Sequence, residues 1–152
     1  MSEYHIPVLL NESVSALNIE ENRDGIFVDA TFGGGGHSRE ILARLGKKGK
    51  LIAFDRDSDA IKNAPDDKRL ILIHNNFRFI QNFTRALGYM GKIDGILGDL
   101  GVSSHQFDTG ERGFSFRFDA PLDMRMNQMA PKSAADVVNG YSQEDLTRIF
   151  KI

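Results

Sequence analysis

The stretch Phe27-Val28-Asp29-Ala30-Thr31-Phe32-Gly33-Gly34-Gly35-Gly36-His37-Ser38 decides the fold. Its first half is an apolar run with β propensity that contains one acidic residue, and its second half contains four consecutive glycines. The segment Arg39–Leu45 follows, and its residues Ile41, Leu42 and Leu45 share one helical face. A strand, a glycine turn and a helix form the first unit of a nucleotide-binding α/β domain. Glycine serves there because it accepts a positive φ and lets a ligand approach the backbone.

A second apolar run, Leu51–Asp55, also ends in an acidic residue. An acid that closes the second strand about 20 residues past a glycine loop is placed to bind the hydroxyls of a ribose. Two plainer interpretations stay open at this point. The glycines can form an ordinary flexible turn, and Asp55 can be a solvated residue at a strand end.

The glycine loop departs from the dinucleotide-binding fingerprint, Gly-x-Gly-x-x-Gly/Ala, because Ser38 occupies the last of these positions. Asp29, on the first strand, would repel a pyrophosphate but can pair with an ammonium group. S-adenosylmethionine carries an ammonium group, a carboxylate and a ribose, and it has no phosphate. The pattern of an acid, three residues and Gly-x-Gly resembles the first motif of class I methyltransferases, and Asp55 resembles their ribose-binding acid.

The composition is typical of a soluble globular protein. The chain has 152 residues, 41% hydrophobic and 26% charged, which suits one domain with a hydrophobic core. It contains no run of about 18 apolar residues that would cross a membrane, and no cysteine for disulfides or thiolate metal sites. The net charge of −2 gives no overall electrostatic case for nucleic acid binding. We therefore expect a cytoplasmic protein with no membrane partner and no metal.

The hydrophobic pattern predicts four parallel strands separated by helices. The strands are expected at Phe27–Phe32, Leu51–Asp55, Leu70–Asn76 and Ile93–Leu100, and the continuous apolar run of the third suits a strand covered on both faces. The helices are expected at Glu12–Asn18, Arg39–Leu45, Asp59–Ala64 and Arg78–Leu87, with capping boxes at Ser133 and Ser142 that start two more. We also expect His5–Leu10 to be extended, Asn11 to cap the first helix, and residues 107–127 to form a long ordered loop.

Two residues at strand ends are candidates for chemistry, because ligands of open α/β sheets lie beyond the carboxyl ends of the strands. Phe77 follows the third strand and is placed to meet an adenine, although a plain core position is an equal alternative. Asp99 ends the fourth strand, beside the cofactor loop. An exocyclic amine of a base is a poor nucleophile, and a carboxylate that accepts its N–H returns electron density to the nitrogen. The alternative for Asp99 is a structural aspartate.

A more restrictive resemblance rests on four stretches: His5–Glu12, Asp29–Ser38, Gly95–Gln106 and Glu111–Met126. They contain Asp-Leu-Gly-Val-Ser-Ser, Glu-Arg-Gly-Phe-Ser-Phe and Pro-Leu-Asp-Met-Arg-Met, and together they resemble the MraW-type methyltransferases, which methylate N4 of a cytosine in bacterial 16S ribosomal RNA. The resemblance implies a class I methyltransferase fold, a Rossmann-like doubly wound parallel sheet. Residues 1–108 would form the S-adenosylmethionine-binding domain, and residues 109–152 a lid loop and the start of a helical substrate-recognition insertion.

The same resemblance assigns roles to individual residues. It implies contacts to S-adenosylmethionine from Gly33, Gly35, Gly36, His37, Asp55, Phe77, Asp99 and Gln106. It assigns the catalytic loop to Asp99, Ser103 and Ser104, with Asp99 as the hydrogen-bond acceptor and no metal. Candidate contacts to the small-subunit ribosomal RNA are Arg112, Arg117, Arg125 and Lys132, and a stacking face for the base is sought among Phe114, Phe116 and Phe118.

Two rival functions share this type of fold. The rivals are a dinucleotide-dependent oxidoreductase and a non-catalytic binding or assembly protein with the same fold. By resemblance the sheet would have seven strands ordered 3-2-1-4-5-7-6, so four strands make it incomplete. Strand four then has an open edge, and such an edge invites pairing with another chain. We therefore expect a truncated chain that self-associates through strand four, binds the cofactor weakly and lacks methylation activity alone.

Overall fold

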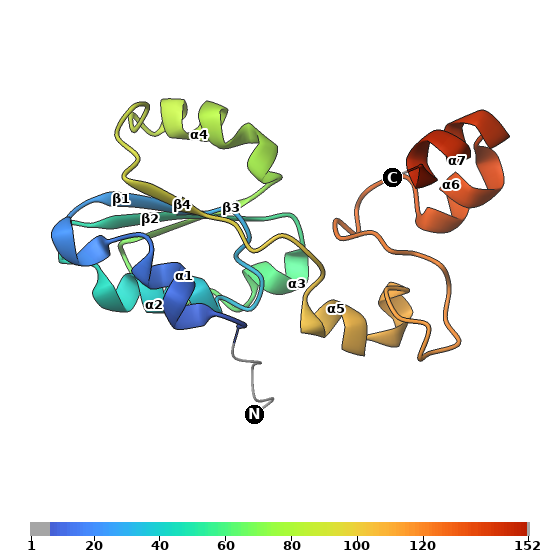
Figure 1. Cartoon of the computed structure of the whole chain (residues 1–152), viewed down its shortest axis with the longest axis horizontal. Coiled ribbons are helices and arrows are strands. Elements are labelled where there is room, and N and C mark those ends of the chain that lie inside the picture. Colours follow the sequence, from blue (N-terminus) through green and yellow to red (C-terminus); the bar gives the residue numbers. More distant parts are fainter. Residues whose placement is uncertain (1–6, 152) are drawn as a thin grey trace. The chain divides into compact units, whose positions relative to one another are not determined.

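Two units make up the computed structural model, Met1–Gly101 and Val102–Ile152, and residues 7–151 are described (Figure 1). The expected extended conformation of His5 and Ile6 lies outside the described residues.

A four-stranded parallel sheet in the order β3-β2-β1-β4 forms the centre of the first unit. Its strands are β1 (Ile26–Asp29), β2 (Lys50–Asp55), β3 (Leu70–His74) and β4 (Gly95–Leu97). In the central register Val28 pairs with Ile52 on one side and with Ile96 on the other. The predicted four parallel strands, with strand one beside strand four, are confirmed.

Strands β1 and β4 end earlier than predicted, because the chain leaves the sheet to build loops at their carboxyl ends. The first strand was expected to continue to Phe32, but its ladder stops at Asp29. Beyond that point two separate backbone hydrogen bonds still connect the segment to its neighbours. The Ala30 N–H donates to the Leu97 carbonyl, and the Phe32 N–H donates to the Phe54 carbonyl, both at 2.8 Å. These bonds hold the start of the glycine loop against its two neighbouring strands.

Helices cover both faces of the sheet (Figure 1). The helical elements of the first unit are α1 (Leu10–Ser15), η1 (Ile19–Glu21), α2 (Gly36–Arg44), α3 (Ser58–Ile61), η2 (Phe77–Phe79) and α4 (Ile80–Ala86). The predicted apolar face of α2 is confirmed, since Ile41 and Leu42 are buried in one core cluster with Phe27 and Leu51. On the other face, Phe83 of α4 packs edge-on against Phe54 of β2, with ring centroids 5.8 Å apart.

Several helix ends differ from the prediction. Helix α1 begins at Leu10, so the expected extended conformation of this residue is wrong, and Asn11 does not cap the helix because Leu9 holds the N-cap position. Helix α2 begins at Gly36, three residues before the predicted start, because Gly35 turns the chain at φ 78° and the helix can follow at once. Asp57 caps α3, since its carboxylate accepts the Asp59 N–H, and the helix begins at Ser58, one residue before the predicted start.

The two outer strands of the sheet are less covered than their apolar sequences suggest. Strand β3 pairs only with β2 among the described residues, and it is half-buried rather than enclosed on both faces. Strand β4 pairs only with β1 there, and Ile96 is 55% exposed. An apolar run thus predicts that a segment joins a sheet, but it does not predict whether helices and neighbouring strands bury that segment completely.

The second unit is helical. Its elements are α5 (Ser104–Asp108), η3 (Gly110–Arg112), α6 (Ala134–Gly140) and α7 (Gln143–Phe150). The capping box predicted at Ser133 is confirmed: its hydroxyl accepts the Asp136 N–H at 3.2 Å, and the Asp136 carboxylate accepts the Ser133 N–H at 2.8 Å. At Ser142 the cap is confirmed in its first half, because the hydroxyl accepts the Asp145 N–H at 3.1 Å and donates to the Asp145 carboxylate at 2.9 Å. The compact units divide after Gly101, whereas the functional division after residue 108 stays a prediction.

Candidate cofactor-binding and catalytic site

The glycine loop links the carboxyl end of β1 to the first turn of α2. Gly33 and Gly35 adopt φ values of 51° and 78°, in the left-handed region that glycine accepts without steric strain. A Cβ at Gly35 would lie 2.8 Å from the Phe32 ring and 2.9 Å from an Arg39 guanidinium nitrogen. The space beside Gly35 is therefore filled by the protein itself. At Gly33 the nearest atom to an added Cβ is the Thr31 carbonyl oxygen at 3.9 Å, so a ligand can approach the backbone on that side.

Asp29 organises this loop from inside. Its carboxylate is fully buried, and it accepts the Ser38 hydroxyl at 2.6 Å and the Thr31 N–H at 3.0 Å. Burial raises the pKa of Asp29, and the bonds from Ser38 and Thr31 act against that shift. The sequence-based expectation that Asp29 pairs directly with an ammonium group is wrong for this arrangement, because the carboxylate has no exposed surface. The residue acts on a ligand only through the loop that it holds.

Asp55 is brought directly to the glycine loop. One carboxylate oxygen accepts the Gly33 N–H at 2.7 Å, and the other accepts the Asp57 N–H at 2.9 Å. A carboxylate offers about four lone-pair sites, so about two are left for further donors. The side chain is half-buried and reachable. The strand-end acid and the glycine loop are thus joined by a hydrogen bond, and the predicted contact of Asp55 with a ribose stays a prediction.

His37 lies in the first turn of α2 with only 5% of its surface exposed. Its Nε2 atom is buried and has no hydrogen-bond partner. A buried ring nitrogen without a partner is unfavourable, because most buried polar groups in folded proteins are hydrogen-bonded. A polar ligand at the loop would relieve this.

Phe77 follows the end of β3, three residues beyond His74, which pairs with Asp55 in the sheet register. It starts the short helix η2, where the Asn76 side chain accepts the Arg78 N–H and caps the turn. The ring is 42% exposed, so the alternative of a plain core position is wrong. An exposed aromatic face beyond a strand end can stack on a planar ligand.

Asp99 is anchored beside the loop by a contact that the sequence analysis missed. Its backbone N–H donates to the Thr31 hydroxyl oxygen at 2.8 Å, while the Thr31 N–H donates to Asp29. Thr31 therefore connects the end of strand β1 with the chain beyond β4. The Asp99 residue itself is exposed. The usable sequence signal was a hydroxyl residue two positions after the strand-end acid.

The remaining predicted site residues, Ser103, Ser104 and Gln106, belong to the second unit. Ser103 caps α5: its hydroxyl accepts the Gln106 N–H at 3.2 Å, and the Gln106 side chain accepts the Ser103 N–H at 3.0 Å. Gln106 is buried, so its amide supports this turn whatever else it contacts. The Ser-x-x-Gln spacing is a capping-box signature and could have predicted helix α5.

The four predicted RNA contacts are mostly engaged within the second unit. Arg112 is 7% exposed and donates to the Arg125 and Met126 carbonyls, so its assignment as an RNA contact is wrong: a buried guanidinium cannot reach a phosphate. Arg125 pairs with Asp123 at 2.7 Å, which also lowers the pKa of Asp123.

The other two basic candidates are closer to the surface. The exposed Arg117 pairs with Asp108 at 2.8 Å. The Lys132 ammonium lies 4.9 Å from the centroid of the Tyr141 ring. Both stay predictions as RNA contacts.

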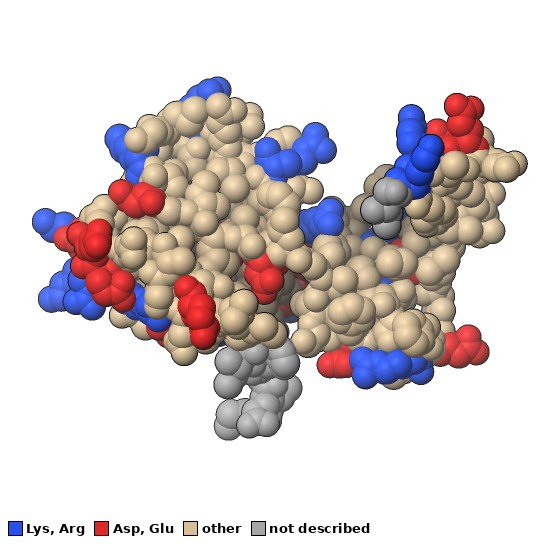
Figure 2. All heavy atoms as spheres, viewed as in Figure 1, with Lys and Arg blue, Asp and Glu red and all other residues tan. Residues whose placement is uncertain are grey.

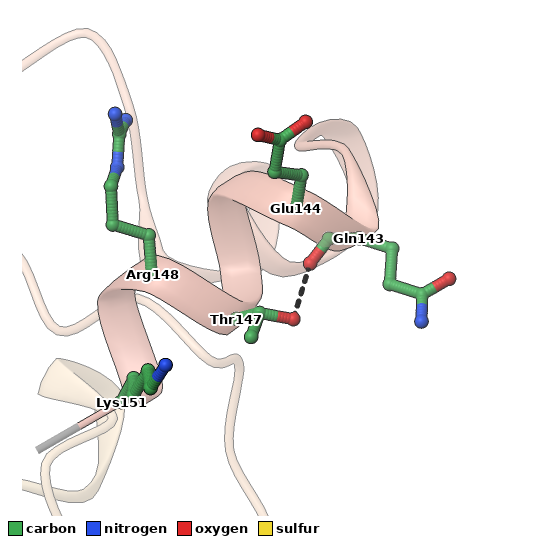
Figure 3. A pocket seen from close by; sticks show the side chains of 5 residues that line it. All are labelled: Gln143, Glu144, Thr147, Arg148 and Lys151. Atoms are coloured by element: carbon green, nitrogen blue, oxygen red, sulfur yellow. Dashed lines mark hydrogen bonds between the residues drawn. The ribbon is translucent and has the colours of Figure 1, made fainter.

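An open surface pocket runs along one side of α7, lined by Gln143, Glu144, Thr147, Arg148 and Lys151 (Figure 3). The Thr147 hydroxyl donates to the Gln143 carbonyl at 2.7 Å, as in an ordinary helix turn. The pocket includes none of the predicted site residues. Among residues 7–151 no His, Cys, Asp or Glu side chains form a group of three that could hold a metal ion. No helix in that range is long and apolar enough to cross a membrane.

Comparison with known proteins places these features in a family context. Residues 2–152 match the MraW methylase family. Over 147 residues the chain is 57% identical to the ribosomal RNA small subunit methyltransferase H of Parabacteroides distasonis, covering 97% of this chain and 48% of the relative. The protein of the same name from Flavobacterium johnsoniae is 61% identical, over 97% of this chain and 48% of the relative. The one from Christiangramia forsetii is 58% identical, over 99% of this chain and 49% of the relative. The chain thus spans about half the length of the curated relatives it matches.

Proposed function

Because the chain belongs to the MraW methylase family, we propose that the protein transfers a methyl group from S-adenosylmethionine to N4 of a cytosine in small-subunit ribosomal RNA. The observation that carries the proposal is the convergence of Asp55 on the glycine loop, through the 2.7 Å bond to Gly33, with Asp99 tied to the same loop through Thr31. The names of the relatives support the substrate class. A ribosomal RNA substrate implies action in the cytoplasm.

The residues around the loop fit S-adenosylmethionine on three counts. The Asp55 carboxylate keeps about two free lone-pair sites for the two ribose hydroxyls. The exposed ring of Phe77 offers a stacking face for an adenine. The buried Nε2 of His37 lacks a partner, and a polar group of the cofactor would supply one. Gly33 and Gly36 contribute backbone around the loop, and Gly35 keeps its turn closed.

Bound S-adenosylmethionine supplies an electrophilic methyl group. The protein's part is to hold the nucleophile in line with it and to make the nucleophile stronger. We assign the second task to Asp99, whose carboxylate accepts an N–H of the exocyclic amine. The charge on the carboxylate favours the positive charge that develops on the nitrogen as the new bond forms. Thr31 holds the Asp99 backbone while this happens.

The second unit is proposed to recognise the RNA. Ser103 and Ser104, at the start of α5, are assigned to the loop that meets the target base, and Gln106 to the cofactor side of the same loop. The functional division would then fall near residue 108, after this helix. Arg117 and Lys132 are the predicted basic residues that keep surface exposure in this unit.

Two further expectations follow from the proposal. A dinucleotide-dependent oxidoreductase is disfavoured, because the buried Asp29 carboxylate accepts the Ser38 hydroxyl at the position where that fingerprint has its last glycine. The described edge of β4 carries exposed apolar surface at Ile96, and we propose that the 152-residue chain alone self-associates there. Light scattering on that chain tests this, and a monomer at high concentration would contradict it.

Titration calorimetry with S-adenosylmethionine and, separately, with NAD tests the cofactor assignment in the full natural protein. We expect saturable binding of the first and none of the second. Incubation with labelled cofactor and small-subunit ribosomal RNA then tests methyl transfer. Binding without transfer to any RNA would favour the non-catalytic alternative.

A further inference from the structure

The surface of helix α4 has a one-sided charge that the proposed chemistry does not use. Between Asp67 and Asp94 the sequence contains no acidic residue, and its basic residues there are Lys68, Arg69, Arg78, Arg85 and Lys92. The whole chain has 21 acidic and 19 basic residues, so the positive charge of this segment contrasts with the slightly negative net charge of the chain. Figure 2 shows Lys and Arg atoms, and no Asp or Glu atoms, over α4.

The exposed side of η2 and α4, which follow each other without a break, carries hydrogen-bond donors. Arg78 lies in the 3-10 turn η2, directly before α4, and Gln81, Asn82 and Arg85 lie in α4. Their spacing, i, i+3, i+4 and i+7, favours one side of the continuous helical segment. All four are exposed. The opposite side is fixed by packing, since Ile80 and Phe83 contact the core cluster over the sheet. We call the four residues the α4 stripe.

The nearest acids in the chain do not neutralise the stripe. Asp67 pairs with Arg69 at 2.6 Å, and its pKa is lowered to about 2 by that partner. Asp94 accepts the Asn22 side chain at 2.9 Å and the Ile26 N–H at 2.7 Å. Both carboxylates are therefore committed elsewhere in the first unit.

The two arginines of the stripe have no carboxylate partner among residues 7–151. Other arginines there are ion-paired, among them Arg44, Arg69, Arg117, Arg125 and Arg148. The Arg78 guanidinium instead lies over the Phe79 ring, 4.7 Å from its centroid, which limits its freedom while leaving it exposed. At a rise of about 2 Å per residue in η2 and about 1.5 Å in α4, seven residues separate the two charges by about 11 Å.

We propose that the α4 stripe contacts the phosphate backbone of the RNA substrate, an inference that rests on the proposed function. Exposed arginines with amide donors between them suit phosphate oxygens, which are the commonest protein contacts of nucleic acids. The stripe begins at the residue after Phe77. An RNA strand that runs along the stripe therefore reaches the carboxyl end of the sheet, where Asp55 lies. The stripe positions RNA and carries no base specificity.

The test compares two double variants of the full natural protein with equal charge loss. R78Q/R85Q removes the charges of the stripe, and glutamine keeps a helix propensity close to that of arginine. K47Q/K48Q removes two exposed lysines from the turn before β2 and serves as the matched control. The probe is a fluorescein-labelled single-stranded RNA of about 20 nucleotides, titrated by anisotropy from 50 to 300 mM salt.

We expect R78Q/R85Q to weaken RNA binding at least tenfold at low salt. The slope of log K against log salt should fall by about 1.4, because each phosphate of a single strand that a basic side chain neutralises adds about 0.7 to the slope. The control should change affinity less than threefold, and calorimetry with S-adenosylmethionine should give the same affinity for both variants. Equal effects of the two variants, or none, would overturn the proposal.

Two further arms separate the possible failures. If wild-type protein transfers no methyl group to ribosomal RNA, the proposed function fails, while the anisotropy titration still decides on the stripe. If R78Q/R85Q loses binding to phosphatidylserine vesicles and keeps its RNA affinity, the stripe serves an anionic membrane surface and the RNA proposal is overturned.

Discussion

Replacing Asp55 with alanine tests the structural basis of cofactor binding. The carboxylate accepts the Gly33 and Asp57 N–H groups at 2.7 and 2.9 Å, and we assign its remaining lone pairs to a ribose. Hydrogen bonds to charged groups contribute about 1.5–3 kcal/mol each. Loss of one such bond corresponds to a roughly 10- to 150-fold loss of affinity. The side chain is half-buried, so we expect a value near the lower end.

The control for this variant is Asp57→Asn. It removes a carboxylate charge two residues away, but asparagine caps a helix as well as aspartate does, so the bond to the Asp59 N–H is kept. Titration calorimetry of both variants with S-adenosylmethionine gives the affinities, and thermal unfolding shows whether the fold survives. We expect Asp57→Asn to bind within threefold of wild type.

Unchanged affinity in a folded Asp55→Ala protein would refute the assignment of this carboxylate to the cofactor. A similar loss in both variants would refute it too, because the effect would then come from general charge near the loop. A loss confined to Asp55→Ala supports it.

Three other variants test the remaining interactions. Gly35→Ala should lower the free energy of unfolding, measured in urea, by more than Gly88→Ala does. Both glycines have a positive φ, at which an alanine costs about 1–2 kcal/mol. Of these two positions, only at Gly35 would the new Cβ meet other atoms within 4 Å. Thr31→Val should slow methyl transfer at saturating cofactor and change cofactor affinity little, because it removes the acceptor of the Asp99 N–H. Asp67→Asn should lower the Tm at pH 7 and leave it unchanged near pH 2. The pKa of Asp67 falls from 3.8 to about 2 on folding, so its stabilisation is present above about pH 4 and is lost as the pH falls toward 2.

Each of these expectations has a contrary result. Equal losses of stability for the two glycine variants would mean that the close approach of Phe32 and Arg39 to Gly35 does not constrain the loop. A Thr31→Val protein with the wild-type rate would show that the hydroxyl does not position Asp99. A Tm difference for Asp67→Asn that persists at pH 2 would show that its effect does not come from the carboxylate charge.

The sequence was sufficient to predict the sheet, for physical reasons. Apolar runs such as Leu51–Asp55 are separated by glycine and polar turns, and a short parallel crossover leaves few possible topologies. Strand ends were harder to predict, since apolar residues such as Phe32 and Leu100 recur in the sequence after the ladder has stopped. The hydrophobic pattern of a sequence indicates which side chains are buried in the core. It does not indicate where the hydrogen bonds between two strands stop, because that depends on where the backbone turns away to make other bonds.

The candidate site was predictable where the position of a residue in the fold leaves it one main role. A strand-end acid near a glycine loop had to lie close to it, and the bond between Asp55 and Gly33 follows from that topology. The roles of Thr31 and Arg112 were harder to predict, although the place of Thr31 two positions after a strand-end acid was a signal. One depends on a hydrogen bond across 68 residues of sequence, and the other on burial that a charged residue in a loop does not reveal.

Analysis of the nucleosides from methylated RNA tests the central claim most directly. Small-subunit ribosomal RNA is incubated with the full natural protein and saturating S-adenosylmethionine, digested, and assayed by mass spectrometry for N4-methylcytidine. We predict that wild type forms this nucleoside, and that Asp99→Asn forms it at least about 100-fold more slowly while binding the cofactor within threefold of wild type. Methylation at any other atom, or a near-normal rate in Asp99→Asn, would contradict the account.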